Sequence, residues 1–119
     1  MKIAISAKGT DLDSAVDPHF GRGAYLLIVD TDSLDIEAID NSENVKSFRG
    51  AGIQAATTIY EKGAQALLTG FCGPNAFKTC QAAGVKVIND VSGTVIDAVQ
   101  NYKAGKLIIS DAPNTEGHE

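Results

Sequence analysis

The fold of this chain is decided by residues 24–40, AYLLIVDTDSLDIEAID. Residues 24–30 form a continuous apolar run, which is typical of a strand buried on both faces of a sheet. The polar residues 31–33 predict a turn, and residues 34–40 then alternate apolar and acidic side chains, as a half-buried outer strand does. The stretch therefore predicts a hairpin of one central and one outer strand.

Outward from this hairpin, the chain alternates strands and helices. Residues 2–7 alternate isoleucine with smaller residues and predict a strand that precedes the hairpin. Glycines and one proline mark the ends of the later elements. We expect these as a helix at 52–62, a strand at 65–69, a helix at 75–83, a strand at 85–88 and a helix at 94–104.

Two of the expected helices have a recognisable apolar face. In the helix at 52–62, we expect Ile53, Ala56 and Tyr60 to share the buried face. The helix at 94–104 shows the i, i+3, i+4, i+7 spacing with Val95, Ala98, Val99 and Tyr102.

The order β-β-β-α-β-α-β-α leaves few possible sheet topologies. A meander of three strands makes the first and third point the same way, and right-handed crossovers place the last two strands parallel to the first. The simplest result is a five-stranded mixed sheet of order 3-2-1-4-5 with three helices. We therefore predict an α/β chain with a ribonuclease H-like three-layer fold.

Length and composition favour one domain, at residues 1–109, followed by a flexible polar tail at residues 110–119. No apolar run reaches the roughly 20 residues that span a bilayer, and no signal-peptide core is visible, so we expect a cytoplasmic protein with no membrane partner. The net charge of −5 disfavours a nucleic-acid partner, because such binding neutralises phosphates with basic side chains. The two cysteines are expected to be reduced thiols.

The predicted topology brings several loops to one edge of the sheet. The connections at 8–22, 41–52, 70–75 and 89–94 all leave the carboxyl edge, where open α/β sheets bind ligands. All three helices start there with unpaired backbone N–H groups. The glycines at these starts would let the backbone approach a ligand, or they only cap and connect the elements. The candidate backbone contacts are Gly50, Gly52, Gly73, Asn75, Gly93 and Thr94.

Basic side chains gather in the same loops of an otherwise acidic protein. The two arginines, Arg22 and Arg49, lie in predicted loops, as do Lys8 and Lys46. We expect a locally positive crevice that takes an anionic ligand. The alternative is scattered, solvated charge.

The loop after the first strand contains Asp17-Pro18-His19-Phe20-Gly21-Arg22. His19 offers a metal ligand, Phe20 a hydrophobic cover, Gly21 an accessible backbone and Arg22 an anion-pairing guanidinium. Loops carry function more often than packing. His19 could also be only a hydrogen-bonding residue of the loop.

The cysteines differ in their positions. Cys72 precedes an expected helix N-terminus, where a thiolate is favoured, so it joins His19 as a candidate metal ligand. Cys80 lies three residues after Phe77 on the helix and is expected to pack in the core. Their spacing is not that of a zinc site. If a metal binds, most of its ligands must come with it.

Several enzyme classes are disfavoured. Residues 50–55 match G-x-G-x-x-A, but a long loop precedes them and no acidic residue ends the next strand, so we reject dinucleotide binding. The central strands at 2–7 and 65–69 lack the carboxylates of a metal-dependent nuclease. We therefore predict that the protein is not an enzyme.

Five groups of residues follow one another along residues 2–109: Ile3–Ser6; Val16 with His19–Arg22; Gly50–Ile53; Gly70 with Gly73–Ala76; and Gly93–Val95 with Ala98, Val99 and Gly105–Leu107. In this order they resemble the dinitrogenase iron-molybdenum cofactor biosynthesis family, of NifX-like and NifB C-terminal-like proteins. The resemblance implies a ribonuclease H-like fold without nuclease activity. It also implies binding of a molybdenum-containing metal–sulfur cluster, either Mo-Fe-S or, as in members of the orange-protein type, Mo-Cu-S. His19 would then contact the cluster.

These observations together predict a non-enzymatic carrier or scaffold that binds an anionic molybdenum-containing cluster at the carboxyl edge, with a possible protein partner for cluster transfer. The alternative is a regulatory domain whose Phe20 and Phe71 surface, or whose tail, binds a protein such as an ATPase. An enzyme that handles anions or nucleotides would need a general base that cannot be placed.

Overall fold

A computed structural model describes residues 1–41 and 50–114 of the chain. The strands are β1 Lys2–Ala7, β2 Tyr25–Asp30, β3 Ile36–Asp40, β4 Ala66–Leu68 and β5 Lys86–Ile88, and the helices are α2 Ala51–Glu61, α3 Pro74–Ala82 and α4 Val95–Lys103. Their order is the predicted one. Within the described ranges, none of the helices is both long and apolar enough to cross a membrane.

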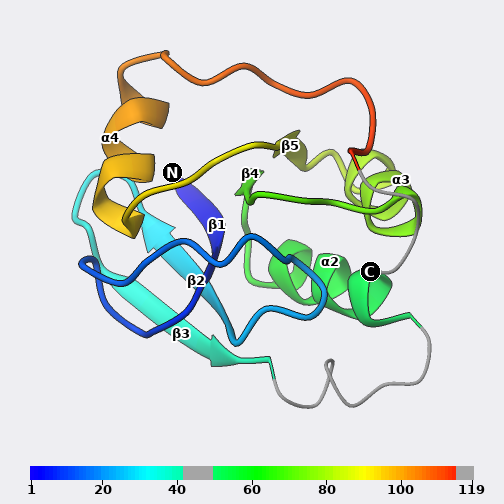
Figure 1. Cartoon of the computed structure of the whole chain (residues 1–119), viewed down its shortest axis with the longest axis horizontal. Coiled ribbons are helices and arrows are strands. Elements are labelled where there is room, and N and C mark those ends of the chain that lie inside the picture. The colour runs from blue at the N-terminus through cyan, green and yellow to red at the C-terminus, as the bar shows by residue number, and fades with distance from the viewer. Residues whose placement is uncertain (42–49, 115–119) are drawn as a thin grey trace.

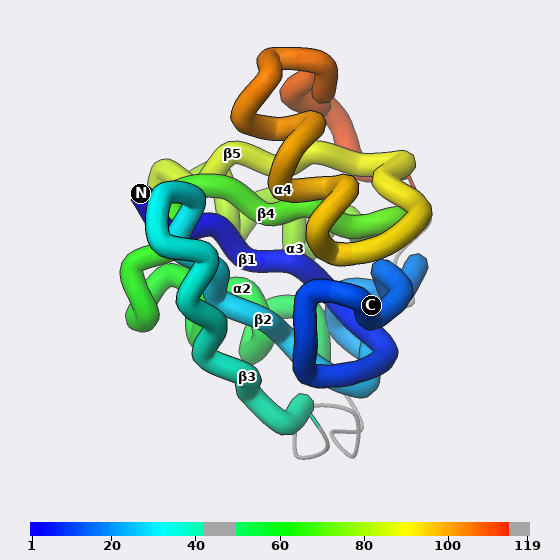
Figure 2. Tube along the Cα trace, turned by 90° about the vertical axis from the view of Figure 1, so that its left-hand side faces the viewer, coloured from blue at the N-terminus to red at the C-terminus, as the bar shows by residue number. Residues whose placement is uncertain are grey.

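The strands form one sheet in the order β3-β2-β1-β4-β5, which confirms the predicted topology. β2 runs antiparallel to both β1 and β3, whereas β4 is parallel to β1 and β5 is parallel to β4. Helices α2 and α3 cover one face of the sheet and α4 covers the other (Figures 1 and 2). The predicted three-layer α/β fold is therefore confirmed.

The sheet separates two apolar cores, and alternate residues of β1 contribute to each. Ala4 lies in the core under α2 and α3, together with Phe20 and Phe77. Ile3 and Ile5 lie in the core under α4. All carboxyl ends of the parallel strands thus lie at an edge that is supported from both faces.

The outer strand of the hairpin starts two residues later than predicted. Leu34 has a φ of 64°, in the left-handed region, so the turn extends to this residue and the extended strand begins at Ile36. The apolar side chain of Leu34 still packs against the core under α4. Its contribution to the apolar pattern made it look like part of the strand.

The predicted buried face of α2 is wrong for two of its three residues. Ile53 and Tyr60 are 41% and 53% exposed, and only Ala56 is buried as expected. The face that packs on the sheet consists instead of small residues and one isoleucine, which allow the helix to approach the sheet closely. These residues are Ala51, Gly52, Ala55, Ala56 and Ile59.

The polar segment after residue 109 is held against the sheet as far as the structure describes it. Ser110 donates its N–H to the carbonyl of Val87 (2.8 Å), and its Oγ accepts from the N–H of Asn89 (3.0 Å). We call residues 110–114 the C-terminal strap. Figure 1 shows the chain after α4 crossing the molecule to the side of α3. Residues 110–114, predicted to begin a flexible polar tail, thus make hydrogen bonds to β5 and to the loops that follow β4 and β5.

Candidate functional site

The loop that contains His19 is fixed by side-chain hydrogen bonds. The carboxylate of Asp17 accepts from the N–H of His19 (3.0 Å). Asn41, buried just after β3, donates its amide to the carbonyls of Gly21 (3.0 Å) and Gly23 (2.8 Å). The loop therefore has a defined shape at the carboxyl edge.

Phe20 attaches this loop to the core. Its side chain is fully buried under α2 and α3, so the predicted role of a hydrophobic cover at the surface is wrong. Gly21 is buried as well, and Arg22 is exposed. Of the four residues that follow Pro18, His19 and Arg22 are thus the two whose side chains reach the surface.

His19 and Phe71 form an exposed aromatic pair, the His19–Phe71 pair. Their main chains form a parallel bridge, and their ring centroids lie 6.0 Å apart at an interplanar angle of 36°. Phe71 donates its N–H to the carbonyl of Pro18 (2.6 Å) and is 42% exposed. The preceding Gly70 packs so tightly that a Cβ there would lie 2.7 Å from Cα of Pro18. An imidazole and a phenyl ring therefore lie side by side at the surface.

Two buried hydroxyl groups connect β1 with the segments that lead to His19 and Phe71. Ser6 Oγ donates to the carbonyl of Asp17 (2.7 Å) and lies 2.8 Å from Thr69 Oγ1. Both residues are fully buried. Sequence analysis did not propose Ser6 and Thr69 as site residues, although polar side chains near the ends of apolar strands were a visible signal. It named Phe71 only as part of a partner-binding surface.

The N-terminus of α4 is occupied by the chain itself. Thr94 Oγ1 accepts from the N–H of Asp97 (3.3 Å), in the arrangement of a helix cap. The N–H groups of the first two helical residues donate to the carbonyls of Ser14 and Leu12 (both 2.9 Å). Gly93, with a φ of 88°, provides the turn into the helix. The expectation that α4 offers free N–H groups to a ligand is therefore wrong.

The other two helices begin without side-chain caps among the described residues. Gly73 precedes α3 with an extended backbone, Pro74 starts the helix, and the next residue, Asn75, is exposed. Gly50 precedes α2 with a φ of 76°, and Gly52 is buried in the helix. Their positive dipole ends lie at the same edge as His19.

Both cysteines are fully buried thiols. The thiol of Cys72 donates weakly to the carbonyl of Gly73, with Sγ and O 3.7 Å apart. This burial argues against the ligand role predicted for Cys72. Burial also raises the pKa of the Cys80 thiol to about 12, in accord with the predicted packing role.

Two of the four basic residues that were predicted to line a positive crevice lie among the described residues. Lys8 and Arg22 are exposed, whereas Lys46 and Arg49 lie outside the described residues. No group of three or more histidine, cysteine, aspartate or glutamate side chains in the described ranges is arranged to hold a metal ion. Of the two predicted metal ligands, His19 is the one whose side chain reaches the surface at the edge.

Comparison with known proteins agrees with this fold. Residues 1–105 match the model of the family described as dinitrogenase iron-molybdenum cofactor. The apo form of the orange protein from Desulfovibrio gigas has a TM-score of 0.93 and 43% identity, with 96% of both chains covered. A NifB-like protein of the DUF35 family from Thermotoga has a TM-score of 0.82 and 34% identity, with 98% of both chains covered. An uncharacterised Methanocaldococcus jannaschii protein is 27% identical over 109 residues, which span 90% of this chain and 89% of that relative. This chain belongs to the dinitrogenase iron-molybdenum cofactor family.

Proposed function

We propose that this protein is a non-enzymatic carrier or scaffold that binds an anionic molybdenum-containing metal–sulfur cluster at the carboxyl edge of its sheet. The cluster, of the Mo-Cu-S or Mo-Fe-S type, is cargo that a partner protein receives or supplies. Membership of a family named for the iron-molybdenum cofactor supports this proposal. Similarity to the orange protein over nearly the whole chain supports it further.

The His19–Phe71 pair is the observation that carries the proposal. A cluster of this kind brings its own sulfide ligands, so the protein needs to supply few metal–ligand bonds. The imidazole of His19 is a surface donor of the right chemistry, and the ring of Phe71 gives polarizable sulfide an apolar neighbour. Arg22 on the same loop adds positive charge at the surface.

The loop is also ordered before any ligand arrives. Asp17 and Asn41 fix its main chain, and Ser6 ties it to β1. Binding then has little ordering entropy to overcome, which strengthens the affinity that a few contacts can give. A carrier benefits from such a site, because it must hold its cargo without enclosing it.

Reconstitution of the purified protein tests the proposal. In one arm the protein is mixed with tetrathiomolybdate and copper, and in the other with isolated iron-molybdenum cofactor. The visible charge-transfer absorption that stays with the protein after gel filtration is then measured. We expect retention in at least one arm, and its absence from both would contradict the proposal.

Matched variants test the assignment of the site. His19→Ala and Phe71→Ala should each weaken retention about tenfold, the equivalent of about 1.4 kcal/mol. Tyr60→Ala removes an aromatic side chain that is similarly exposed but lies on α2, and it should leave retention unchanged. If Phe71→Ala and Tyr60→Ala reduced retention equally, the cluster would not bind specifically at the His19–Phe71 pair.

The alternative function, a regulatory domain that binds a partner protein, can also be tested, because Phe71 is exposed. That alternative placed a partner such as an ATPase on Phe20 and Phe71 or on the tail, and the burial of Phe20 leaves Phe71 and the strap. A partner captured equally well by the wild-type protein and by His19→Ala/Arg22→Ala would favour it. A partner captured only by cluster-loaded protein would favour the carrier.

A further inference from the structure

We propose that Asn114, in the C-terminal strap, is a positioning residue for the cluster site. It holds the loop that places Phe71 beside His19. The effect on cluster binding rests on the proposed function, whereas the positioning of Phe71 does not. The strap lies beyond residues 1–105, which match the family model.

Asn114 bonds the main chain on both sides of Phe71. Its Oδ1 accepts from the N–H of Cys72 (2.9 Å), and its Nδ2 donates to the carbonyl of Gly70 (2.8 Å). Its backbone N–H donates to the carbonyl of Cys72 (3.2 Å). The Nδ2 also donates to the carboxylate of Asp90 (3.2 Å). One amide side chain therefore joins the exits of β4 and β5 to the strap.

The same short loop is bonded from its other side by the loop of His19. Phe71 donates its N–H to the carbonyl of Pro18, and its main chain bridges with His19. Asp90, with a φ of 62°, donates its N–H to the carbonyl of Gly70 (3.0 Å). Phe71 thus stands between the His19 loop and the strap, and a shift of Gly70 or Cys72 would move its ring relative to the imidazole.

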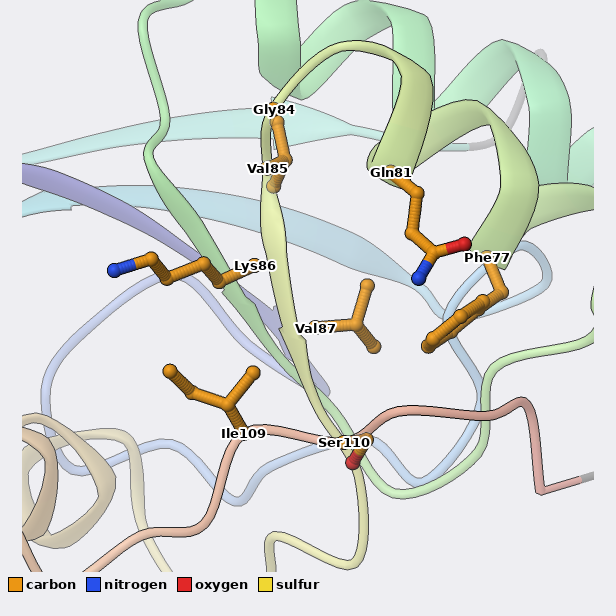
Figure 3. A pocket seen from close by; sticks show the side chains of 8 residues that line it. All are labelled: Phe77, Gln81, Gly84, Val85, Lys86, Val87, Ile109 and Ser110. Carbon is orange, nitrogen blue, oxygen red and sulfur yellow. The ribbon is translucent and has the colours of Figure 1, made fainter.

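Polar contacts, not apolar burial, hold the strap. Ile108 and Ile109, which lead into it, are 84% and 52% exposed. A groove of about 280 Å³ remains beside Ile109 and Ser110, lined by β5 and by Phe77 and Gln81 of α3 (Figure 3). Because apolar contact is sparse here, the hydrogen bonds of Asn114 are the main attachment at the end of the strap.

Between Ser110 and Asn114, the strap has a weaker polar attachment to the side chain of Asn89. Asn89 donates its Nδ2 to the carbonyl of Ala112 (3.2 Å), but its Oδ1 is buried with no hydrogen-bond partner in the described structure. A buried polar atom without a partner makes the arrangement in which the strap lies against the sheet less stable. The end of the strap therefore depends mainly on the side chain of Asn114, and its removal should free this end while Ser110 stays bonded to Val87 and Asn89.

The inference is tested with Asn114→Ala and with Asp111→Ala as the matched control. Asp111 is an exposed strap residue for which the described structure shows no side-chain hydrogen bond. Nuclear Overhauser effects between the ring protons of His19 and Phe71 report the pair directly in the protein without cluster. Retention of the tetrathiomolybdate–copper probe after gel filtration reports the site. Circular dichroism confirms that each variant is folded.

We expect Asn114→Ala to abolish the Overhauser effects between the rings and to release the probe several-fold faster, by no more than the factor of about ten expected for Phe71→Ala, because Asn114 acts through the position of Phe71. Asp111→Ala should change neither. Asn114→Asp keeps the acceptor for Cys72, but it has no donor for Gly70 and faces Asp90, so it should abolish the Overhauser effects as well. Asn114→Asp replaces Asn114→Ala in the test if the alanine variant fails to fold.

Two outcomes would overturn the inference. Overhauser effects that persist without the Asn114 amide would show that the strap does not position Phe71. Their disappearance with no change in probe release would show that the site does not need the pair. If the wild-type protein does not retain the tetrathiomolybdate–copper probe, release is measured with isolated iron-molybdenum cofactor instead. If it retains neither, the proposed function fails, and the positioning by Asn114 is then decided by the Overhauser effects alone.

Discussion

Gly70 occupies a position where no larger residue fits. A Cβ at this residue would lie 2.7 Å from Cα and 2.8 Å from the carbonyl oxygen of Pro18, which are backbone atoms. We predict that Gly70→Ala lowers the free energy of unfolding by about 2 kcal/mol, because the His19 loop must move to make room. Gly84→Ala is the control: its Cβ would meet nothing within 4 Å, but its φ of 78° costs about 1 kcal/mol of backbone strain. Equal losses in urea titrations of the two variants would contradict the steric account.

The titration of Cys80 gives a pH-dependent prediction. Burial raises its pKa from 9.0 to about 12, so the unfolded chain loses this proton at a lower pH than the folded protein does. Between these values the folded state binds more protons, and stability therefore falls as pH rises above about 9, by at most about 1.4 kcal/mol per pH unit from this group. Below about pH 8 the contribution is constant. Urea titrations of the wild type and Cys80→Val from about pH 7 to about pH 10.5 should diverge only above about pH 9, and parallel curves would contradict this prediction.

Two phenylalanines mark what the sequence could not reveal at the level of single residues. Phe20 and Phe71 both lie in irregular segments next to glycines, where no periodic pattern tells whether a side chain points inward. Sequence analysis therefore proposed Phe20 as a ligand contact, although Phe20 is buried and Phe71 is the ring beside His19. The surface positions of His19 and Arg22 agree with a surface role for both.

Helix α2 shows the same difficulty for a whole element. The prediction chose the large residues Ile53 and Tyr60 for the buried face, whereas alanines and Ile59 form it. We predict that Ile59→Ala, at a fully buried site, lowers the free energy of unfolding by about 3 kcal/mol. Ile53→Ala makes the same change on the exposed side of the same helix and should cost less than about 0.5 kcal/mol. If chemical denaturation gave similar decreases in the free energy of unfolding for both variants, Ile53 would lie on the buried face, as the sequence predicted.

The hydroxyl pair of Ser6 and Thr69 joins β1 to the residue that follows β4. Ser6→Ala or Thr69→Val alone leaves one buried hydroxyl with fewer partners, so each should cost about 1–3 kcal/mol. The double variant removes both groups and should cost less than the sum of the two single changes. A double-mutant cycle measured by urea denaturation checks this coupling. Strict additivity would show that the hydroxyl contact contributes nothing.

For the whole molecule, topology was predictable because it follows from the order of elements. Three leading strands followed by alternating helices and strands leave one simple sheet order, and this is the observed one. The convergence of loops at the carboxyl edge follows from the same order. The strap was not predictable, because residues 110–114 are polar and show no periodicity. Its position depends on individual hydrogen bonds to distant segments, which no local pattern encodes.

The strap should affect the site more than the fold. Each of its hydrogen bonds stabilises by about 1 kcal/mol, whereas ordering each of its residues costs about 1–2 kcal/mol, so the two effects nearly cancel. Deleting residues 110–119 should therefore change the free energy of unfolding by less than about 2 kcal/mol. The local effect is larger, because the N–H of Cys72 no longer has Oδ1 of Asn114 as its acceptor and its hydrogen exchange should accelerate. The N–H of Ile5, in the central strand β1, should keep its protection. Equal acceleration at both amides would mean that the strap stabilises the entire fold and not the site in particular.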